Sequence, residues 1–141
     1  MNYWLIGLPR ERLEFCMKVG IFGLNRKYIL GKVKEKDKIL FYSTKERQIL
    51  ATGEITDEYY VDDQRVFTDK SLFPNNELFP DRIGFSVERL TQPVDFIPII
   101  DQMSFIKSLA NWQVHFRSAI VQIAKSDWDL ISNEAQKIPA S

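Results

Sequence analysis

Two neighbouring strand-forming segments place the strongest constraint on the fold of this chain. Residues 38–44 (KILFYST) and 48–60 (QILATGEITDEYY) are rich in β-branched and aromatic residues and are joined by a short polar turn. Gly53, inside the second segment, predicts a bulge or a close approach of two backbones. A further strand is predicted at residues 82–90 (RIGFSVERL), where apolar and polar residues alternate. A first strand is expected at residues 2–7.

The helical signals lie at the start and at the end of the chain. Pro9 suits the first turn of a helix that Gly20 would end. Apolar spacing after Pro98 predicts a helix over residues 99–109 and a second one over 112–123. Ser126 is expected to cap a last short helix. The two segments between these elements, residues 20–37 and 61–80, are expected to be mainly loop.

Strands therefore dominate the first two-thirds of the chain, helices dominate the end, and no βαβ unit repeats. This order predicts an α+β fold, most simply a small β-barrel with helices packed on it. The length of 141 residues fits a single domain spanning residues 1–141, because two domains would each be too small to bury an adequate core.

Composition narrows the class of protein. Cys16 is the only cysteine, which excludes an internal disulfide and a cysteine-based zinc site. No apolar run approaches the roughly 20 residues that span a bilayer, and the first residues lack the basic leader of a signal peptide. We therefore expect a cytoplasmic protein with no membrane partner.

The charge is balanced overall but unevenly distributed. The chain carries 19 basic and 19 acidic residues. Residues 26–47 contain eight basic residues against three acidic ones, so the rest of the chain has an equal negative excess. A neutral protein with one basic segment can bind a polyanion through that face. A solvated lysine-rich hairpin is the alternative interpretation.

No catalytic constellation is found. The phosphate-loop, dinucleotide, nucleophile-elbow and zinc-protease motifs are all absent. His115 is the only histidine and lies in a segment of apolar periodicity, while Cys16 falls among the apolar positions of its helix. The acidic pairs at 57–58 and 62–63 are expected to be solvated. We therefore predict no enzymatic activity, no metal and no cofactor.

The order of several segments resembles a known family. These segments are YWL at 3–5, GIFGLNRKY at 20–28, KEKDKILFYS at 34–43, GEITDEYYVDDQRVF at 53–67, FPDRIGF at 79–85, MSFIKSLANWQVHF at 103–116 and SDWDLI at 126–131. The chain resembles the EVE domain family, a branch of the PUA-like barrels related to the YTH readers of methylated adenine. The resemblance covers residues 2–131. The usual family tryptophan is replaced by Phe22, and the usual Gly-Asp pair by Lys36 and Asp37.

The resemblance implies a six-stranded, partly open barrel that recognises a modified base of DNA or RNA in an aromatic pocket. Two aromatic faces can each stack on a flipped or single-stranded base. Transferred to this sequence, the pocket would have Phe22 as one wall and Phe67 as the other, with Phe22 partly exposed. The remaining implied base contacts are Gly23, Leu24, Asn25, Tyr42 and Ser43, and the implied phosphate contacts are Arg26, Lys27 and Lys34.

Three other functions stay open at this point. The same pocket would also suit a sensor of a free nucleotide or another small planar molecule. An enzyme acting through Cys16, His115 and a carboxylate is the second alternative, and a protein-interaction domain is the third. The basic segment favours nucleic acid over a free base, because a free base needs no phosphate contacts.

Overall fold

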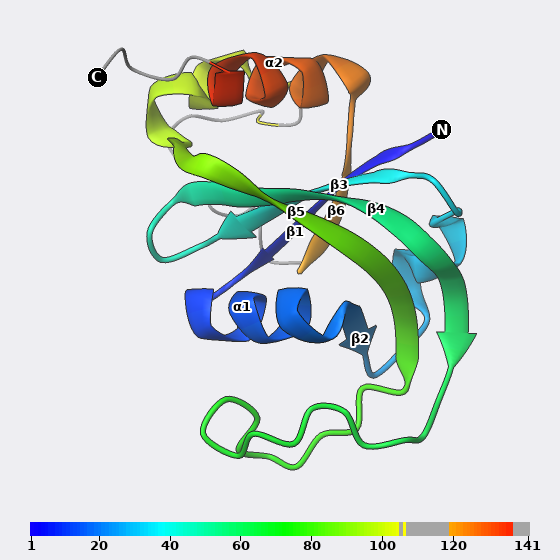
Figure 1. The fold of residues 1–141 in the computed structure, drawn as a ribbon. Helices are drawn as coiled ribbons and strands as arrows, with labels where there is room; N and C mark the ends of the chain where they lie inside the picture. The colour runs from blue at the N-terminus through cyan, green and yellow to red at the C-terminus, as the bar shows by residue number, and fades with distance from the viewer. Residues whose placement is uncertain (105, 107–118, 137–141) are drawn as a thin grey trace.

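A curled sheet of six strands forms the centre of the molecule (Figure 1). The structure is a computed structural model that describes residues 1–104, 106 and 119–136. Its elements in chain order are β1 (Tyr3–Leu8), α1 (Arg10–Val19), β2 (Ile21–Leu24), the 3-10 helix η1 (Tyr28–Lys32), β3 (Lys38–Ser43), β4 (Gln48–Val61), β5 (Asp81–Asp95), the 3-10 helix η2 (Ile97–Gln102), β6 (Ile120–Ile123) and α2 (Lys125–Gln136).

The strand order in the sheet is β2-β5-β4-β3-β1-β6. Strands β1 and β3 run parallel, and every other neighbouring pair is antiparallel. The long strands β4 and β5 bend around α1 and give the sheet the shape of a half-barrel (Figure 1). The predicted α+β fold, a small PUA-like barrel with helices packed on it, is confirmed.

The sheet separates two apolar layers because successive side chains of a strand point to opposite faces. In β1, Trp4 and Ile6 belong to the core that contains α1, whereas Leu5 belongs to the core on the α2 side. In β3, Phe41 and Tyr42 divide in the same way. Figure 1 shows α1 inside the curl of the sheet and α2 on the opposite side.

Helix α1 has the limits that its sequence predicted. It begins directly after Pro9, and Gly20 ends it in a left-handed conformation with φ 72°. The Gly20 N–H donates to the Cys16 carbonyl at 2.8 Å, which satisfies one of the free carbonyls at the helix end. Leu13, Cys16 and Met17 are buried against the sheet.

The segment after residue 96 differs from its helical prediction. Residues 97–102 form a short 3-10 helix, and Ile120–Ile123 form strand β6, so the helix predicted over 112–123 is wrong at its end. Strand β6 pairs with the edge of β1, Ile6 opposite Ile120, and this pairing overrides the helical spacing. The first part of that prediction, residues 112–118 with His115, lies outside the described residues.

Other boundaries shift less. Residues 20–37, predicted as loop, contain the short strand β2, and β5 continues to Asp95. Helix α2 begins at Lys125, and the buried carboxylate of Asp127 accepts from Ala124 N at 2.9 Å and from Ser104 N and Oγ at 2.6 Å.

No helix among the described residues is both long and apolar enough to cross a membrane.

A buried carboxylate fastens the start of the chain to the sheet. Asp37 accepts hydrogen bonds from Asn2 N at 2.9 Å, Trp4 Nε1 at 3.0 Å and Lys34 N at 2.9 Å. Trp4 is fully buried, so its indole N–H needs this acceptor. Asp37 thereby couples β1, the turn before β3 and the largest side chain of the core.

We predict that Asp37→Ala destabilises the fold by about 3 kcal/mol, because it leaves buried donors without an acceptor. Equilibrium urea unfolding followed by tryptophan fluorescence measures the change. Asp63→Ala, which removes an exposed carboxylate, is the matched control and is expected to stay within about 0.5 kcal/mol of the parent. Equal stability of the two variants would contradict this role of Asp37.

Candidate functional site

The predicted wall residue Phe22 is not exposed. It lies in β2 opposite Ile83 of β5 and is 2% exposed, so the expectation of a partly exposed ring is wrong. The physical reason is that residues 21–24 form a strand rather than a loop, and the pairing with β5 turns Phe22 into the core beside α1. Leu24, also predicted to line the pocket, packs against the same core.

Phe67 lies next to Gly23, another residue of the predicted pocket, but three other phenylalanine rings pack around it. We call Phe15, Phe67, Phe73 and Phe79 the aromatic cluster. The ring centroid of Phe67 lies 6.0 Å from Phe15, 5.3 Å from Phe73 and 5.4 Å from Phe79. A Cβ atom on Gly23 would lie 3.0 Å from Phe67 Cε2 and 2.7 Å from the Phe79 carbonyl oxygen. Glycine at this position therefore allows loop 62–80 to pack on β2.

Tyr42 and Ser43 do not lie beside Phe22 or Phe67. Tyr42 faces the core on the α2 side, where its ring lies 5.1 Å from Phe96, and burial raises its pKa to about 12. Ser43 is fully buried, and its hydroxyl donates to the Glu46 carboxylate. The alternation of side chains along β3 places Tyr42 on the face opposite Phe22, so the predicted pocket does not assemble as one site.

The predicted polar and basic contacts lie on the surface. Asn25 Nδ2 donates to Glu77 Oε2 at 2.6 Å. Arg26 and Lys27 are exposed, with the Arg26 guanidinium 5.1 Å from the Tyr28 ring. Lys34 Nζ lies 3.8 Å from a Glu58 carboxylate oxygen, an exposed pair that solvent weakens. The three basic side chains are thus available to phosphate groups.

Arg82 holds loop 62–80 in place and was missed by sequence reasoning. Its side chain is fully buried and donates from Nε to the Phe79 carbonyl at 3.0 Å. Nη2 donates to the carbonyls of Gln64 at 2.5 Å and Leu78 at 3.2 Å. The guanidinium lies 5.5 Å from the centre of the Phe67 ring. A charged residue at the first position of an alternating strand gave no signal of burial.

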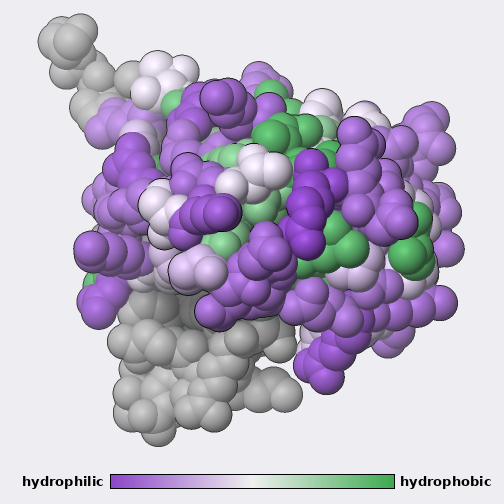
Figure 2. Space-filling view, turned by 90° about the horizontal axis from the view of Figure 1, so that it is seen from below, coloured by the Kyte–Doolittle hydropathy of each residue, from purple (hydrophilic) through white to green (hydrophobic). Residues whose placement is uncertain are grey.

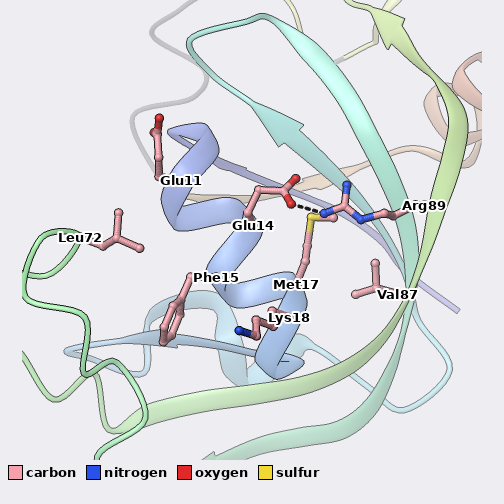
Figure 3. A pocket seen from close by; sticks show the side chains of 8 residues that line it. All are labelled: Glu11, Glu14, Phe15, Met17, Lys18, Leu72, Val87 and Arg89. Atoms are coloured by element: carbon pink, nitrogen blue, oxygen red, sulfur yellow. Dashed lines mark hydrogen bonds and ion pairs between the residues drawn. The ribbon is translucent and has the colours of Figure 1, made fainter.

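A cavity of about 650 Å³ opens between α1, β5 and the tip of loop 62–80 (Figure 3). It is lined by Glu11, Glu14, Phe15, Met17, Lys18, Leu72, Val87 and Arg89. Phe15 belongs to both the aromatic cluster and the cavity, so the cavity has an aromatic wall. Seen from below, the surface of the molecule is mainly purple and polar, with several green apolar patches between the polar residues (Figure 2).

The volume of the cavity lies within the range of small-molecule sites. Small-molecule sites typically measure about 300–1,000 Å³ and combine apolar walls with a few polar groups. The polar groups here include Glu14 and Arg89, whose side chains form an ion pair between α1 and β5. Half of the lining residues could have been grouped from the sequence, because residues 11, 14, 15 and 18 have the spacing of one helix face.

The described residues offer little for covalent or metal chemistry. No group of three or more histidine, cysteine, aspartate or glutamate side chains in residues 1–104, 106 and 119–136 could hold a metal ion. Cys16 is buried, and this burial raises the pKa of its thiol to about 12. A thiol with so high a pKa is almost entirely protonated at neutral pH and is a poor nucleophile.

The chain belongs to the EVE domain family, whose sequence pattern matches residues 2–134. Among curated proteins it is similar to UPF0310 protein PH1033 of Pyrococcus horikoshii. The two sequences are 29% identical over 143 residues, which cover 93% of this chain and 97% of the relative.

Solved structures of the same fold include two complexes with nucleic acid. Human THYN1, solved with 5-methylcytosine-containing DNA, superposes with a TM-score of 0.64 at 18% identity, covering 99% of this chain and 100% of that chain. The YTH domain of Zygosaccharomyces rouxii MRB1, solved with N6-methyladenosine RNA, gives 0.62 at 11% identity, covering 99% and 89%. At these identities the likeness establishes the fold alone.

We predict that Arg82→Lys loosens loop 62–80, because lysine keeps the charge but lacks the planar fork that binds separate carbonyls. Hydrogen exchange of amides in this loop should accelerate roughly tenfold or more, as expected for the loss of buried hydrogen bonds. Lys70→Gln is the control, because Lys70 lies in the same loop and is exposed. Unchanged exchange in Arg82→Lys would show that the aromatic cluster alone orders the loop.

Proposed function

We propose that this protein binds DNA or RNA and holds one modified base in the cavity between α1, β5 and loop 62–80. The single observation that carries the proposal is the cavity itself, which combines an aromatic wall with a charged pair. Phe15 is half-buried and lines the cavity, so part of its ring is accessible to a base. Each stacked base contributes about 1–3 kcal/mol. The function is binding without catalysis.

Two further observations support nucleic acid as the ligand. Relatives of the same fold were solved with DNA or RNA that carries a methylated base. The exposed side chains of Arg26, Lys27 and Lys34 lie in the segment with the positive excess and supply phosphate contacts. A flipped base in the cavity would leave its neighbours and their phosphates outside, where exposed basic side chains can contact them.

The apolar lining supports a modified rather than an ordinary base. Met17, Leu72 and Val87 contribute side chains to the cavity, so a methyl group on the base would meet apolar neighbours. Burying one methyl group contributes about 0.8 kcal/mol, which corresponds to roughly a fourfold preference. The buried and protonated thiol of Cys16 supports the proposal that no covalent step follows binding.

We predict that Phe15→Leu weakens binding of an oligonucleotide carrying one 5-methylcytosine or N6-methyladenine by about 1–3 kcal/mol, because leucine keeps the apolar packing but loses the stacking face. Fluorescence anisotropy at fixed salt, with modified and unmodified competitors, measures the effect. Phe73→Leu is the matched control, since Phe73 belongs to the same aromatic cluster but does not line the cavity.

Two results would contradict the proposed function. One is equal affinity for modified and unmodified strands together with full binding by Phe15→Leu, which would indicate a nonspecific basic surface. The other is tight binding of free nucleosides with no binding of oligonucleotides, which would indicate a small-molecule sensor. Both results are read from the same competition series.

We predict that the double change Lys27→Glu and Lys34→Glu weakens binding equally for all base sequences, because phosphate contacts position the strand without specifying it. Each lost contact should reduce the slope of log affinity against log salt by about 0.7–0.9. Lys125→Glu, on α2 and outside the basic segment, is the matched control and should leave the slope unchanged. An unchanged slope in the double variant would show that these lysines do not contact phosphate groups.

A further inference from the structure

Tyr28 is a large aromatic residue on the surface of the 3-10 helix η1. It is 52% exposed, so much of its ring contributes nothing to the core. Its φ of 44° lies in the left-handed region, which is strained for a residue of this size. Glycine or asparagine would adopt this conformation more readily. A large ring in a strained and exposed position indicates a role in binding rather than in folding.

Basic side chains lie against two aromatic rings in this region. The guanidinium carbon of Arg26 is 5.1 Å from the centre of the Tyr28 ring, and Lys27 Nζ is 5.2 Å from the centre of the Tyr59 ring. Both distances are those of cation–π contacts. We call Arg26, Lys27, Tyr28 and Tyr59 the cation–aromatic surface. None of the four is among the residues that line the cavity, so this surface is distinct from it.

Neighbouring residues hold the second of these pairs in place. Tyr59 Oη donates to Asp81 Oδ1 at 2.5 Å, which anchors the ring between β4 and β5. A Cβ atom on Gly31 would lie 2.5 Å from Lys27 Cε, so glycine at this position lets the lysine side chain lie across η1. Side chains that are already ordered lose less conformational entropy when a ligand binds.

The charge around the cation–aromatic surface favours a polyanion. Residues 20–34 contain four basic side chains and no acidic one. The carboxylates of Glu58 and Asp81 already contact Lys34 and Tyr59. Single-stranded nucleic acid combines phosphates with unpaired bases, and such bases stack on aromatic rings and on guanidinium planes. In a fully paired duplex each base is stacked between its neighbours and offers no free face.

We propose that Tyr28 stacks on an unpaired base of single-stranded DNA or RNA, while Arg26 and Lys27 contact the phosphates beside that base. The inference rests on the proposed function for the class of ligand, nucleic acid, but it adds a second base site outside the cavity. Stacking on a ring requires no particular base edge. The site therefore accepts any base and selects unpaired over paired nucleotides.

Tyr28→Asn is the diagnostic variant, because asparagine suits the left-handed backbone and removes the ring without changing the charge. Its affinity for a short single strand, measured by fluorescence anisotropy in DNA and in RNA of one sequence, should fall about 5- to 100-fold, the loss expected for one stacked base. The affinity for the same sequence as a fully paired duplex should stay almost unchanged. The slope of log affinity against log salt should also stay unchanged, because the lost ring carries no charge.

Two control variants accompany Tyr28→Asn. Tyr28→Phe keeps a ring at this position and should bind the single strand like the parent protein. Ile97→Asn removes another exposed apolar side chain, on η2 and outside the basic segment, and should leave binding unchanged. Thermal unfolding checks the fold of all three variants. Tyr28→Asn should unfold close to the parent temperature, because relief of the backbone strain offsets the lost ring contacts.

The outcomes separate this inference from the proposed function. Unchanged affinity of Tyr28→Asn for the single strand, with binding still dependent on Phe15, would overturn the inference alone. An equal loss for the single strand and for the paired duplex would also overturn it, because the ring would then not act through an unpaired base. Binding that depends on Tyr28 but not on Phe15 would overturn the role of the cavity and leave the inference in place. No binding of any strand by the parent protein would overturn both.

Discussion

The arrangement of this site depends on one buried guanidinium. Loop 62–80 contains no helix or strand of its own, and Arg82 binds the backbone carbonyls of Gln64, Leu78 and Phe79 from within the core. Those bonds bring both ends of the loop to the start of β5. Because the ends are fixed, Phe67 and Phe79 pack on β2. At the tip, Arg12 Nε of α1 donates to the Leu72 carbonyl at 2.8 Å, and Leu72 closes one side of the cavity. A buried cation that satisfies carbonyls thus replaces regular secondary structure.

The half-barrel divides structural and ligand-facing roles between elements. Helix α1 buries Leu13 and Cys16 in the curl of the sheet, while Glu14, Phe15 and Lys18 face the cavity. Met17 contributes to both the core and the cavity lining. Strand β5 supplies the opposite wall through Val87 and Arg89. Since β4 and β5 pair along most of their length, this wall is held rigidly. The cavity therefore lies between two elements that are independently fixed, which suits recognition of a rigid planar ligand.

Sequence reasoning predicted the fold well where local signals agree with tertiary pairing. The strands around residues 38–61, the limits of α1 and the inert position of Cys16 followed from alternation, helix ends and apolar spacing. Strand β6 could not be predicted, because a four-residue apolar segment is decided by the edge that it meets. The site was predicted least well. The burial of Arg82 and the pairing of Glu14 with Arg89 depend on residues 75 positions apart or on loop backbone, which no local pattern encodes.

The burial of Phe22 has a physical explanation in the same fold. A buried tryptophan needs an acceptor for its indole N–H, and here Trp4 has Asp37 for that purpose. Phenylalanine has no such requirement, so a ring at position 22 can enter the core without leaving a polar group unsatisfied. Phenylalanine at position 22, where the resemblance implied a tryptophan, therefore permits complete burial of this side chain. In the proposed site the stacking surface is then Phe15, in the helix that precedes β2, whose ring belongs to the aromatic cluster and also borders the cavity.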